Sequence, residues 1–358
     1  MEMKSIAIIG LGLIGGSLAK SIKHSNTEIK IAAYDFNDIL DRAAKEKVID
    51  ISLPKIYDAL NYDYIFLALP IEQSIKVFEE LIPLLESDQI ISDLCSVKEA
   101  FAQKWNSSSS KGMYVGLHPM AGKEKGGYLN SDYLLFENSV CIVTTDSKNS
   151  QINSFLKTLK STGMKFTFLD PALHDKIVAQ VSHLPQLLSI AMVNTSTKSQ
   201  NGFRYLDFAA GGFRDMTRIA SSSFFIWKDI LKNNKTNVID SLKDFQSKIG
   251  EYIQLIHADN YELLEKEFES AHKNRNEIPS NNKGFLSPLF DITIFVEDKP
   301  GMFSKITTIL FENNINIKDI ELLKIREGSG GNFKLYFETE SDANNATALL
   351  GKAGFKNN

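Results

Sequence analysis

The sequence predicts an α/β domain with a mostly parallel sheet, then an all-α domain, then a small α+β domain of order βαββα. Short apolar runs alternate with helical patterns over residues 1–170, which is typical of parallel strands joined by crossover helices. Only helical periodicity follows over 171–277. A polar linker over 278–288 then precedes residues 289–358, where strand patterns return. A chain of 358 residues is long enough for two or three such domains.

The composition excludes several classes of protein. Hydrophobic residues make up 43% and charged residues 23%, as expected for a folded globular protein rather than a disordered one. The net charge of −4 argues against nucleic acid or an anionic membrane surface as a partner. Two cysteines, Cys95 and Cys141, are too few for a disulfide framework or a zinc site, so we expect no metal and a cytoplasmic location. The sequence contains no run of about 20 apolar residues, so we expect no membrane span.

The first domain is expected to contain short buried strands separated by helices. Helical patterns include Gly16–Lys23, Ile71–Leu85 and Gln151–Thr162, and the serine-rich segment Asn106–Gly112 predicts a loop. The predicted strands are Ser5–Gly10, Ile29–Tyr34, Tyr64–Ala68, Gln89–Ser92, Met113–Gly116, Ser139–Thr144 and Lys165–Phe168.

The second domain is expected to be built from long helices. Helical periodicity runs from Leu173 to about Lys198 and from Asn237 to about Asn274, with the glycine-bearing stretch Gly211–Arg214 between them. Helical domains of this kind, appended to an α/β domain, often dimerise, so we expect a homodimer.

The third domain begins after the linker Ile278–Gly284. A turn at Gly328–Gly331 separates its second and third strands. Its predicted elements are a strand at Phe290–Val296, a helix at Met302–Asn313, strands at Ile315–Ile325 and Phe333–Glu338, and a helix at Asp342–Lys352.

A glycine-rich motif, Gly10-Leu11-Gly12-Leu13-Ile14-Gly15, lies between the first predicted strand and the first predicted helix. The first glycine permits a tight turn, the second lets the backbone approach a pyrophosphate, and the third lets helix and strand pack closely. Free N–H groups at the start of the helix would then hold the phosphates. The sequence therefore predicts a Rossmann-type dinucleotide-binding domain; the alternative is a glycine-rich turn without a ligand.

Asp35 is the second part of the cofactor prediction. It ends the next predicted strand, twenty residues after Gly15, where a ribose-binding carboxylate belongs. Because a carboxylate accepts hydrogen bonds from ribose hydroxyls and repels a 2′-phosphate, we expect NAD rather than NADP.

Two segments carry candidate chemistry at the carboxyl edge of the sheet. His118 follows the strand Met113–Gly116, and an imidazole that titrates near neutrality suits removal of a proton from a hydroxyl that is losing hydride. The alternative is a loop histidine held by its neighbours. Ser96 and Lys98 follow another strand; Ser96 can hydrogen-bond a substrate or simply cap a helix, and Lys98 can hold an anion.

The helical domain adds further candidates. His183 lies two residues before Pro185, which would kink the helix and aim the imidazole inward; the alternative is a buried histidine with satisfied hydrogen bonds. Arg218 is a candidate clamp for a carboxylate, with Asp215 three residues earlier to orient it and Trp227 as a pocket wall. The alternative for this arginine is a surface ion pair.

Several stretches, in this order, resemble the prephenate dehydrogenase family of tyrosine biosynthesis: residues 10–19, 93–98, 116–127, 181–186 and 211–220, with Trp227. The resemblance covers about residues 4–275. It implies NAD-dependent oxidative decarboxylation of prephenate to 4-hydroxyphenylpyruvate. It also implies roles for matching positions. His118 polarises the C4 hydroxyl, Ser96 assists it near the nicotinamide, and His183 organises the site. The implied substrate-binding residues are Arg218, Asp215, Trp227 and Glu124, the last at the pocket mouth.

The C-terminal domain resembles an ACT module. Asp298, Pro300 and Gly301 lie between its first strand and helix, where such modules bind amino acids, and the resemblance implies tyrosine as the feedback ligand. The final strand of the module is missing or very short here, so the alternative is a structural or degenerate domain.

Some residues depart from the family pattern. Cys95 replaces a small glycine or alanine, Gln186 replaces a common histidine, and Ser223–Phe225 stands where an Asp-Pro pair is usual. These changes leave the choice between prephenate and arogenate open. A β-hydroxy acid dehydrogenase is a weaker candidate, because such enzymes typically need a helical-domain lysine. A non-enzymatic sensor of NAD and amino acids is a third candidate.

Overall fold

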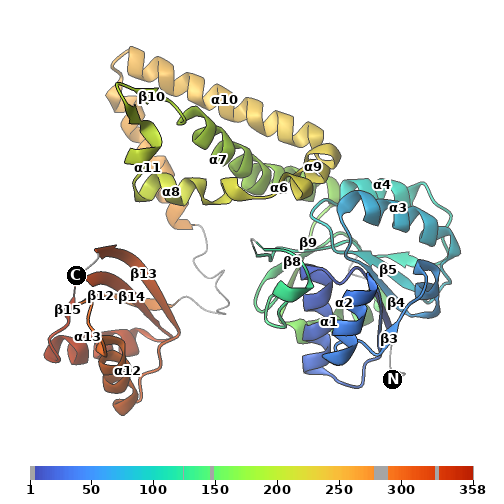
Figure 1. The fold of residues 1–358 in the computed structure, drawn as a ribbon. Helices are drawn as coiled ribbons and strands as arrows, with labels where there is room; N and C mark the ends of the chain where they lie inside the picture. Colours follow the sequence, from blue (N-terminus) through green and yellow to red (C-terminus); the bar gives the residue numbers. More distant parts are fainter. Residues whose placement is uncertain (1–4, 124, 146–148, 278–288, 327–329, 358) are drawn as a thin grey trace. The chain divides into compact units, whose positions relative to one another are not determined.

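The computed structural model describes residues 5–123, 125–145, 149–277, 289–326 and 330–357 (Figure 1). The chain divides into two compact units, Met1–Ala271 and His272–Asn358. The predicted linker and residues 328 and 329 of the predicted glycine turn lie outside the described residues.

The first unit begins with a parallel sheet of spatial order β3-β2-β1-β4-β5-β6. The order reverses between β1 and β4, so the loops after these two strands open a crevice at the carboxyl edge. The strands are β1 (Ile6–Ile9), β2 (Ile31–Tyr34), β3 (Ile51–Ser52), β4 (Tyr64–Leu67), β5 (Ile90–Asp93) and β6 (Met113–Tyr114).

Both faces of this sheet are buried, which explains the continuous apolar runs in its strands. Ile6 and Ile8 of β1 join the hydrophobic cluster beneath α1 (Leu13–Ser25), α2 (Asn37–Lys45) and α5 (Ser150–Leu159). Ala7 and Ile9 point to the opposite cluster, beneath α3 (Ile71–Leu81) and α4 (Glu99–Asn106). The helices therefore cover both faces, and the predicted α/β fold is confirmed.

A second, smaller sheet corrects the prediction of one continuous sheet. It consists of β7 (Leu117–Pro119), β8 (Val140–Val143) and β9 (Lys165–Phe168), with β7 antiparallel to β8. The chain leaves the main sheet after the two residues of β6 and passes Gly116, where a Cβ would lie 2.3 Å from the Thr144 hydroxyl oxygen. His118, expected just after a strand of the main sheet, therefore lies in a short strand of its own that pairs with β8.

The helical part of the first unit follows β9. Its first predicted helix comprises α6 (Pro171–Val178), a π-helical turn η5 (Ala179–His183) and α7 (Leu184–Thr195). The second predicted helix is wrong as one element, because Asp259 adopts a φ of 50° and separates α10 (Lys235–His257) from α11 (Tyr261–Glu277). Between them lie a small hairpin of β10 (Ser199–Gln200) and β11 (Phe203–Arg204), a turn η6 (Tyr205–Phe208), α8 (Gly211–Thr217), a turn η7 (Arg218–Ser221) and α9 (Phe224–Asn233).

The continuous helical stretch Pro171–Thr195 is long and apolar enough to cross a bilayer, by length and composition alone. It carries buried polar residues, however, among them His174, Asp175 and His183. Their hydrogen bonds reach His118, the N-terminus of α4 and Asn234, which precedes α10. The buried polar residues of this stretch therefore form hydrogen bonds with other parts of the protein.

The second unit has the predicted βαββα order, followed by a two-residue strand. Its antiparallel sheet has the order β13-β14-β12-β15, and Ile294, Leu335 and Phe337 pack with Ile306 and Leu350 from its helices. The elements are β12 (Phe290–Val296), α12 (Met302–Glu312), β13 (Asp319–Arg326), β14 (Gly330–Phe337), α13 (Glu340–Lys352) and β15 (Lys356–Asn357).

Candidate active site

A cavity of about 360 Å³ opens at the carboxyl edge of the main sheet. The glycine-rich loop contributes Leu13 and Ile14, the loop after β5 contributes Cys95 and Ser96, and β7 contributes His118. Residues after β4, residues of the segment after β7 such as Lys123, and the α9 residues Phe225, Ile226 and Asp229 also line it. The fold thus brings the predicted cofactor motif and two of the predicted catalytic side chains to one cavity.

The glycine-rich loop fits a dinucleotide. Gly10 has a φ of 99°, and a Cβ there would lie 2.7 Å from the Ala68 carbonyl oxygen. A Cβ on Gly15 would lie 1.9 Å from the Gly10 carbonyl oxygen, whereas one on Gly12 would meet no atom within 4 Å. The first and third glycines therefore permit close packing, and the second leaves open space where a phosphate group can approach the backbone.

Asp35 lies beside this loop at the end of β2. Its carboxylate accepts hydrogen bonds from the backbone N–H groups of Leu11 at 2.5 Å and Phe36 at 2.6 Å. Asp35 also lines a second cavity of about 480 Å³, together with Tyr34 and Lys76. A ribose hydroxyl donor would meet an acceptor there, so the residues present fit an adenine dinucleotide.

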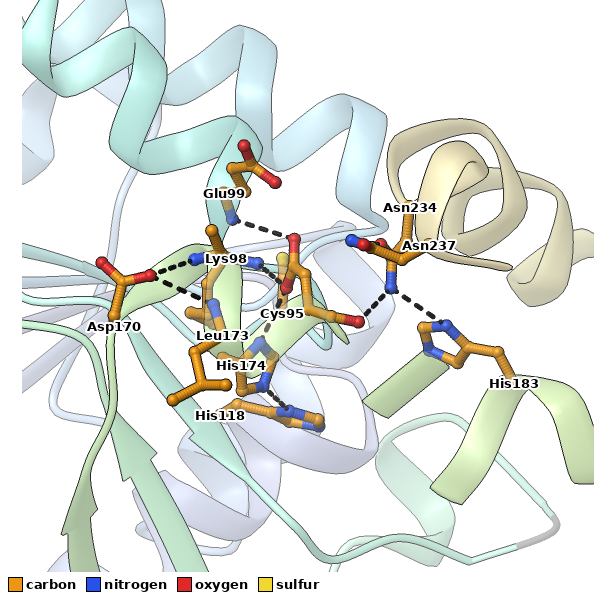
Figure 2. Close-up of polar contacts among 12 residues, drawn as sticks. Cys95, Lys98, Glu99, His118, Asp170, Leu173, His174, His183, Asn234 and Asn237 are labelled. Atoms are coloured by element: carbon orange, nitrogen blue, oxygen red, sulfur yellow. Dashed lines mark hydrogen bonds and ion pairs between the residues drawn. The ribbon is translucent and has the colours of Figure 1, made fainter. Parts of the chain in front are cut away.

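His118 is linked to a buried acid through a second histidine. Its Nδ1 lies 2.8 Å from Nε2 of His174, and Nδ1 of His174 lies 2.7 Å from Oδ1 of Asp175. The Asp175 carboxylate also accepts the backbone N–H groups of Lys98 at 2.8 Å and Glu99 at 3.0 Å. In Figure 2, His174 lies between His118 and the start of α4 at Glu99.

The surroundings of His118 keep its ring neutral. Burial lowers the pKa of His118 well below its usual value, and the charges of His174, Lys98 and His183 act in the same direction. Nε2 of His118 has no hydrogen-bond partner among the residues that the structure describes. The residue therefore offers the cavity an uncharged imidazole nitrogen, as a proton acceptor requires.

His183 is fully buried in the π-helical turn, just before Pro185. Burial lowers the pKa of His183 to about 4, although Asp175 opposes the shift. Asn234 donates one amide N–H to the Asp175 carbonyl oxygen at 2.7 Å, which fixes its amide group, and its nitrogen lies 3.3 Å from Nδ1 of His183. Neutral His183 therefore accepts at Nδ1 and carries its hydrogen on Nε2.

Lys98 requires a correction, because its ammonium group is not available to a substrate. The side chain is fully buried and forms an ion pair with the equally buried Asp93. Asp93 also accepts hydrogen bonds from the Tyr114 hydroxyl at 2.7 Å and the Cys95 backbone N–H at 3.0 Å. The anion that Lys98 holds is thus the chain's own carboxylate, whose pKa burial raises despite these contacts.

Ser96 is half-buried and lines the cavity. Its alternative role as a helix cap is wrong, because α4 begins at Glu99 and the carboxylate of Asp175 accepts from the first helix N–H groups. Cys95 also lines the cavity, and burial raises the pKa of its thiol to about 12. It therefore contributes volume rather than an anionic sulfur.

The arginine side of the predicted site does not line this cavity. Arg218 and Asp215 are exposed on η7 and α8, and neither belongs to the described residues that line the cavity. Trp227 is half-buried, with its ring perpendicular to that of His183 at a centroid distance of 5.9 Å. Gln186 donates to the Ile219 carbonyl oxygen at 2.9 Å and so ties η7 to α7. The predicted Glu124 lies outside the described residues.

Sequence reasoning missed His174, Asp175 and Asn234. The signal for the first two was a His-Asp pair inside an otherwise apolar helical segment, where buried polar residues need partners. Asn234 gave no local signal, because its role depends on where the start of α10 lies relative to α6.

Three family models match the chain. The model described as "Prephenate dehydrogenase, nucleotide-binding domain" matches residues 18–168, and "Prephenate dehydrogenase, dimerization domain" matches residues 170–270. The model described as "ACT domain" matches residues 290–349. The chain is also 32% identical to a prephenate dehydrogenase of Bacillus subtilis, over 98% of this chain and 96% of the relative.

The chain belongs to the prephenate dehydrogenase family. A prephenate dehydrogenase of Lactococcus lactis is likewise 32% identical, with 98% of each chain covered. Among solved structures, a prephenate dehydrogenase from Aquifex aeolicus in complex with hydroxyphenyl propionate and NAD+ has a TM-score of 0.69 and 29% identity, covering 78% of this chain and 99% of that one. A Synechocystis arogenate dehydrogenase has a TM-score of 0.67 and 26% identity, covering 77% and 100% of the two chains.

Proposed function

We propose that this chain catalyses the NAD-dependent oxidative decarboxylation of prephenate to 4-hydroxyphenylpyruvate. The observation that carries the proposal is His118, whose neutral ring lines the same cavity as the glycine-rich loop. Membership of the prephenate dehydrogenase family supports the choice of substrate. The cofactor supplies the hydride acceptor when it is bound, and the positions that would hold it are Gly10, Gly12, Leu13, Ile14, Gly15 and Asp35.

His118 would act on the C4 hydroxyl of the substrate. As C4 is oxidised, the hydroxyl becomes a carbonyl and its proton passes to Nε2 of His118. The ring carboxylate then leaves as CO2, its bonding electron pair enters the ring, and the carbonyl oxygen takes up a proton to become the phenol. Because aromatisation drives this last step, the protein mainly has to position the hydroxyl. Ser96 lines the same cavity and would share that hydrogen bond.

We further propose that the remaining predicted residues act around this centre. His183 would organise the wall of the site beside Trp227, and Arg218 would bind a substrate carboxylate with Asp215 nearby. The exposure of this arginine, and of Phe208, Met216 and Phe224 on the same part of the chain, supports completion of the site by a second copy in a homodimer.

We propose the same domain assignment as the sequence predicted. Residues 1–170 would bind the cofactor, 171–277 would bind substrate and dimerise, and 289–358 would regulate, after the linker 278–288. We also propose a cytoplasmic location for the enzyme.

The regulatory ligand that we propose is tyrosine. The ACT domain has a cavity of about 470 Å³ between the end of β12 and the start of α12. Asp298 lines it with Lys299 and Phe303, and Gly301, with a φ of 85°, turns the chain into α12 after Pro300. Charged groups beside an aromatic ring suit an aromatic amino acid.

The test is NADH formation at 340 nm with prephenate or arogenate, with NAD or NADP, and with or without added tyrosine. We expect the highest kcat/KM with prephenate and NAD, and a lower rate in the presence of tyrosine. A higher kcat/KM with arogenate would reassign the substrate. No NADH from either substrate, in a protein that still binds NAD, would favour a non-enzymatic sensor.

A further inference from the structure

We propose that His174 and Asp175 are positioning residues that fix the tautomer of His118. In this arrangement a chain of hydrogen bonds runs from the N-terminus of α4 to the cavity and forces the lone pair of His118 onto Nε2. The proposal deepens the proposed function, because the lone pair matters only if His118 takes a proton from a substrate hydroxyl.

The chain of hydrogen bonds begins at Asp175, which is fully buried. Its Oδ1 receives the backbone N–H of Lys98 and its Oδ2 receives that of Glu99, at the start of α4. Two N–H donors at a helix N-terminus favour an ionised carboxylate, which can only accept hydrogen bonds. Nδ1 of His174, 2.7 Å from Oδ1, must therefore be a donor.

The next link is the pair of imidazoles. A neutral histidine has one N–H and one lone pair, so His174 with its hydrogen on Nδ1 has its lone pair on Nε2. That lone pair faces Nδ1 of His118 at 2.8 Å, and a hydrogen bond at this distance requires His118 to be the donor. The hydrogen of His118 is thus held on Nδ1, and its Nε2 is left as an acceptor.

The opposite tautomer would be inactive. With its hydrogen on Nε2, His118 would present a donor to the substrate hydroxyl and could not take its proton. A neutral imidazole without such partners can adopt either form.

The kinetic test compares two substitutions at His174. His174→Leu removes the acceptor, whereas His174→Gln can place an amide oxygen near the position of Nε2. We expect His174→Leu to lower kcat by about 10²–10⁴-fold, by analogy with loss of the tautomer-fixing acid in a catalytic triad. The KM values for prephenate and NAD should change little, and His174→Gln should recover roughly tenfold or more of the loss in kcat.

The spectroscopic test reads the tautomer itself. In the full-length protein with ¹⁵N-labelled histidine, heteronuclear NMR distinguishes protonated from unprotonated ring nitrogens. His118→Asn identifies the His118 signals among those of the six histidines. We expect Nδ1 of His118 to be protonated and Nε2 unprotonated in the parent protein, and a mixture of the two forms in His174→Leu. The exposed His257→Leu is the matched control and should change neither the His118 signals nor kcat.

Either of two results would overturn the proposal: a proton on Nε2 of His118 in the parent protein, or full kcat in His174→Leu. If His174→Leu does not fold, the NMR spectrum of the parent protein and the kinetics of Asp175→Asn test the proposal instead. Full kcat in Asp175→Asn would also exclude a role for the chain of hydrogen bonds. Failure of the proposed function would look different, since the parent protein would then form no NADH from prephenate whatever the tautomer of His118.

Discussion

The two sides of the candidate site differ in how completely one chain builds them. On the His118 side, the polar partners that the structure describes are internal: His174 and Asp175 are buried, and hydrogen bonds join them to His118 and to the start of α4. On the Arg218 side, the side chains are exposed and lie among exposed apolar residues. The first side is pre-organised by folding, whereas the second is open to solvent, and we propose that a second copy of the chain completes it.

This difference matches the proposed roles of the two sides, which are proton transfer at His118 and binding of a substrate carboxylate at Arg218. A proton acceptor must hold one geometry and one protonation state, and buried hydrogen bonds provide both. A carboxylate clamp can be assembled when substrate or a second chain arrives. Substitutions on the first side should therefore act on kcat or on stability, and those on the second side on KM.

The largest effect should follow from His118→Asn. We expect kcat to fall by a factor of about 10²–10⁴, because the proton acceptor is lost while the cavity keeps its shape. NAD affinity, measured by titration calorimetry, should stay within about twofold of the parent value. Unchanged turnover would remove His118 from the mechanism and with it the distinction between the two sides.

Lys98→Met tests the buried framework of the first side. Removal of the ammonium group leaves the fully buried Asp93 without its ion-pair partner, and we expect the free energy of unfolding to fall by about 3–5 kcal/mol. Urea denaturation followed by tryptophan fluorescence measures this, since Trp105 and Trp227 both lie in the first unit.

The matched control is Lys98→Met combined with Asp93→Asn, in which no charge is left unpaired. It should recover part of the lost stability. If Lys98→Met alone has the stability of the parent protein, the ion pair does not support the site.

Arg218→Ala tests the exposed side. We expect the KM for prephenate to rise by about 30–100-fold, near the low end of the loss for a hydrogen-bonded charge pair, with little change in kcat or stability. Steady-state kinetics with varied prephenate measure it, and the exposed Arg204→Ala is a control at a position without a proposed role. An unaltered KM would make Arg218 a surface arginine.

The sequence was sufficient for the parts of the site that depend on local pattern. The glycine-rich motif and Asp35 each follow a strand of the parallel sheet, so their loops lie at one edge of it, and His118 follows the last strand of that sheet along the chain. It was insufficient where function depends on long-range packing. The role of Asp175 requires α6 to lie against the start of α4, and Asp175 is 77 residues away from Lys98 in the sequence.

Lys98 was misassigned for a related reason. A lysine after a strand can face a cavity or turn back to a carboxylate in the same loop, and only the fold decides between them. The position of β7 was also beyond pattern reasoning, because its pairing with β8 is set by the chain leaving the main sheet early.

The smallest effect that we predict concerns pH and compares the two histidines themselves. Burial lowers the pKa of His183 from 6.5 to about 4 in the folded protein, so the unfolded chain binds more protons between these values. Stability from neutral His183 is therefore present above pH 6.5 and is lost as the pH falls toward 4. Between pH 6.5 and 5 the loss is about 2 kcal/mol.

The measurement is the change in unfolding free energy between pH 6.5 and 5, from urea titrations of the parent protein and of His183→Asn. The variant should lose about 2 kcal/mol less than the parent over this interval, since its side chain does not titrate. The pKa of His118 is also lowered, and this residue is present in both proteins. The unfolding free energy of the variant should therefore still depend on pH, but less steeply than that of the parent. If both proteins lose the same unfolding free energy over this interval, His183 is solvated. His183 would then not belong to the buried side of the site, which would be limited to His118 and its partners.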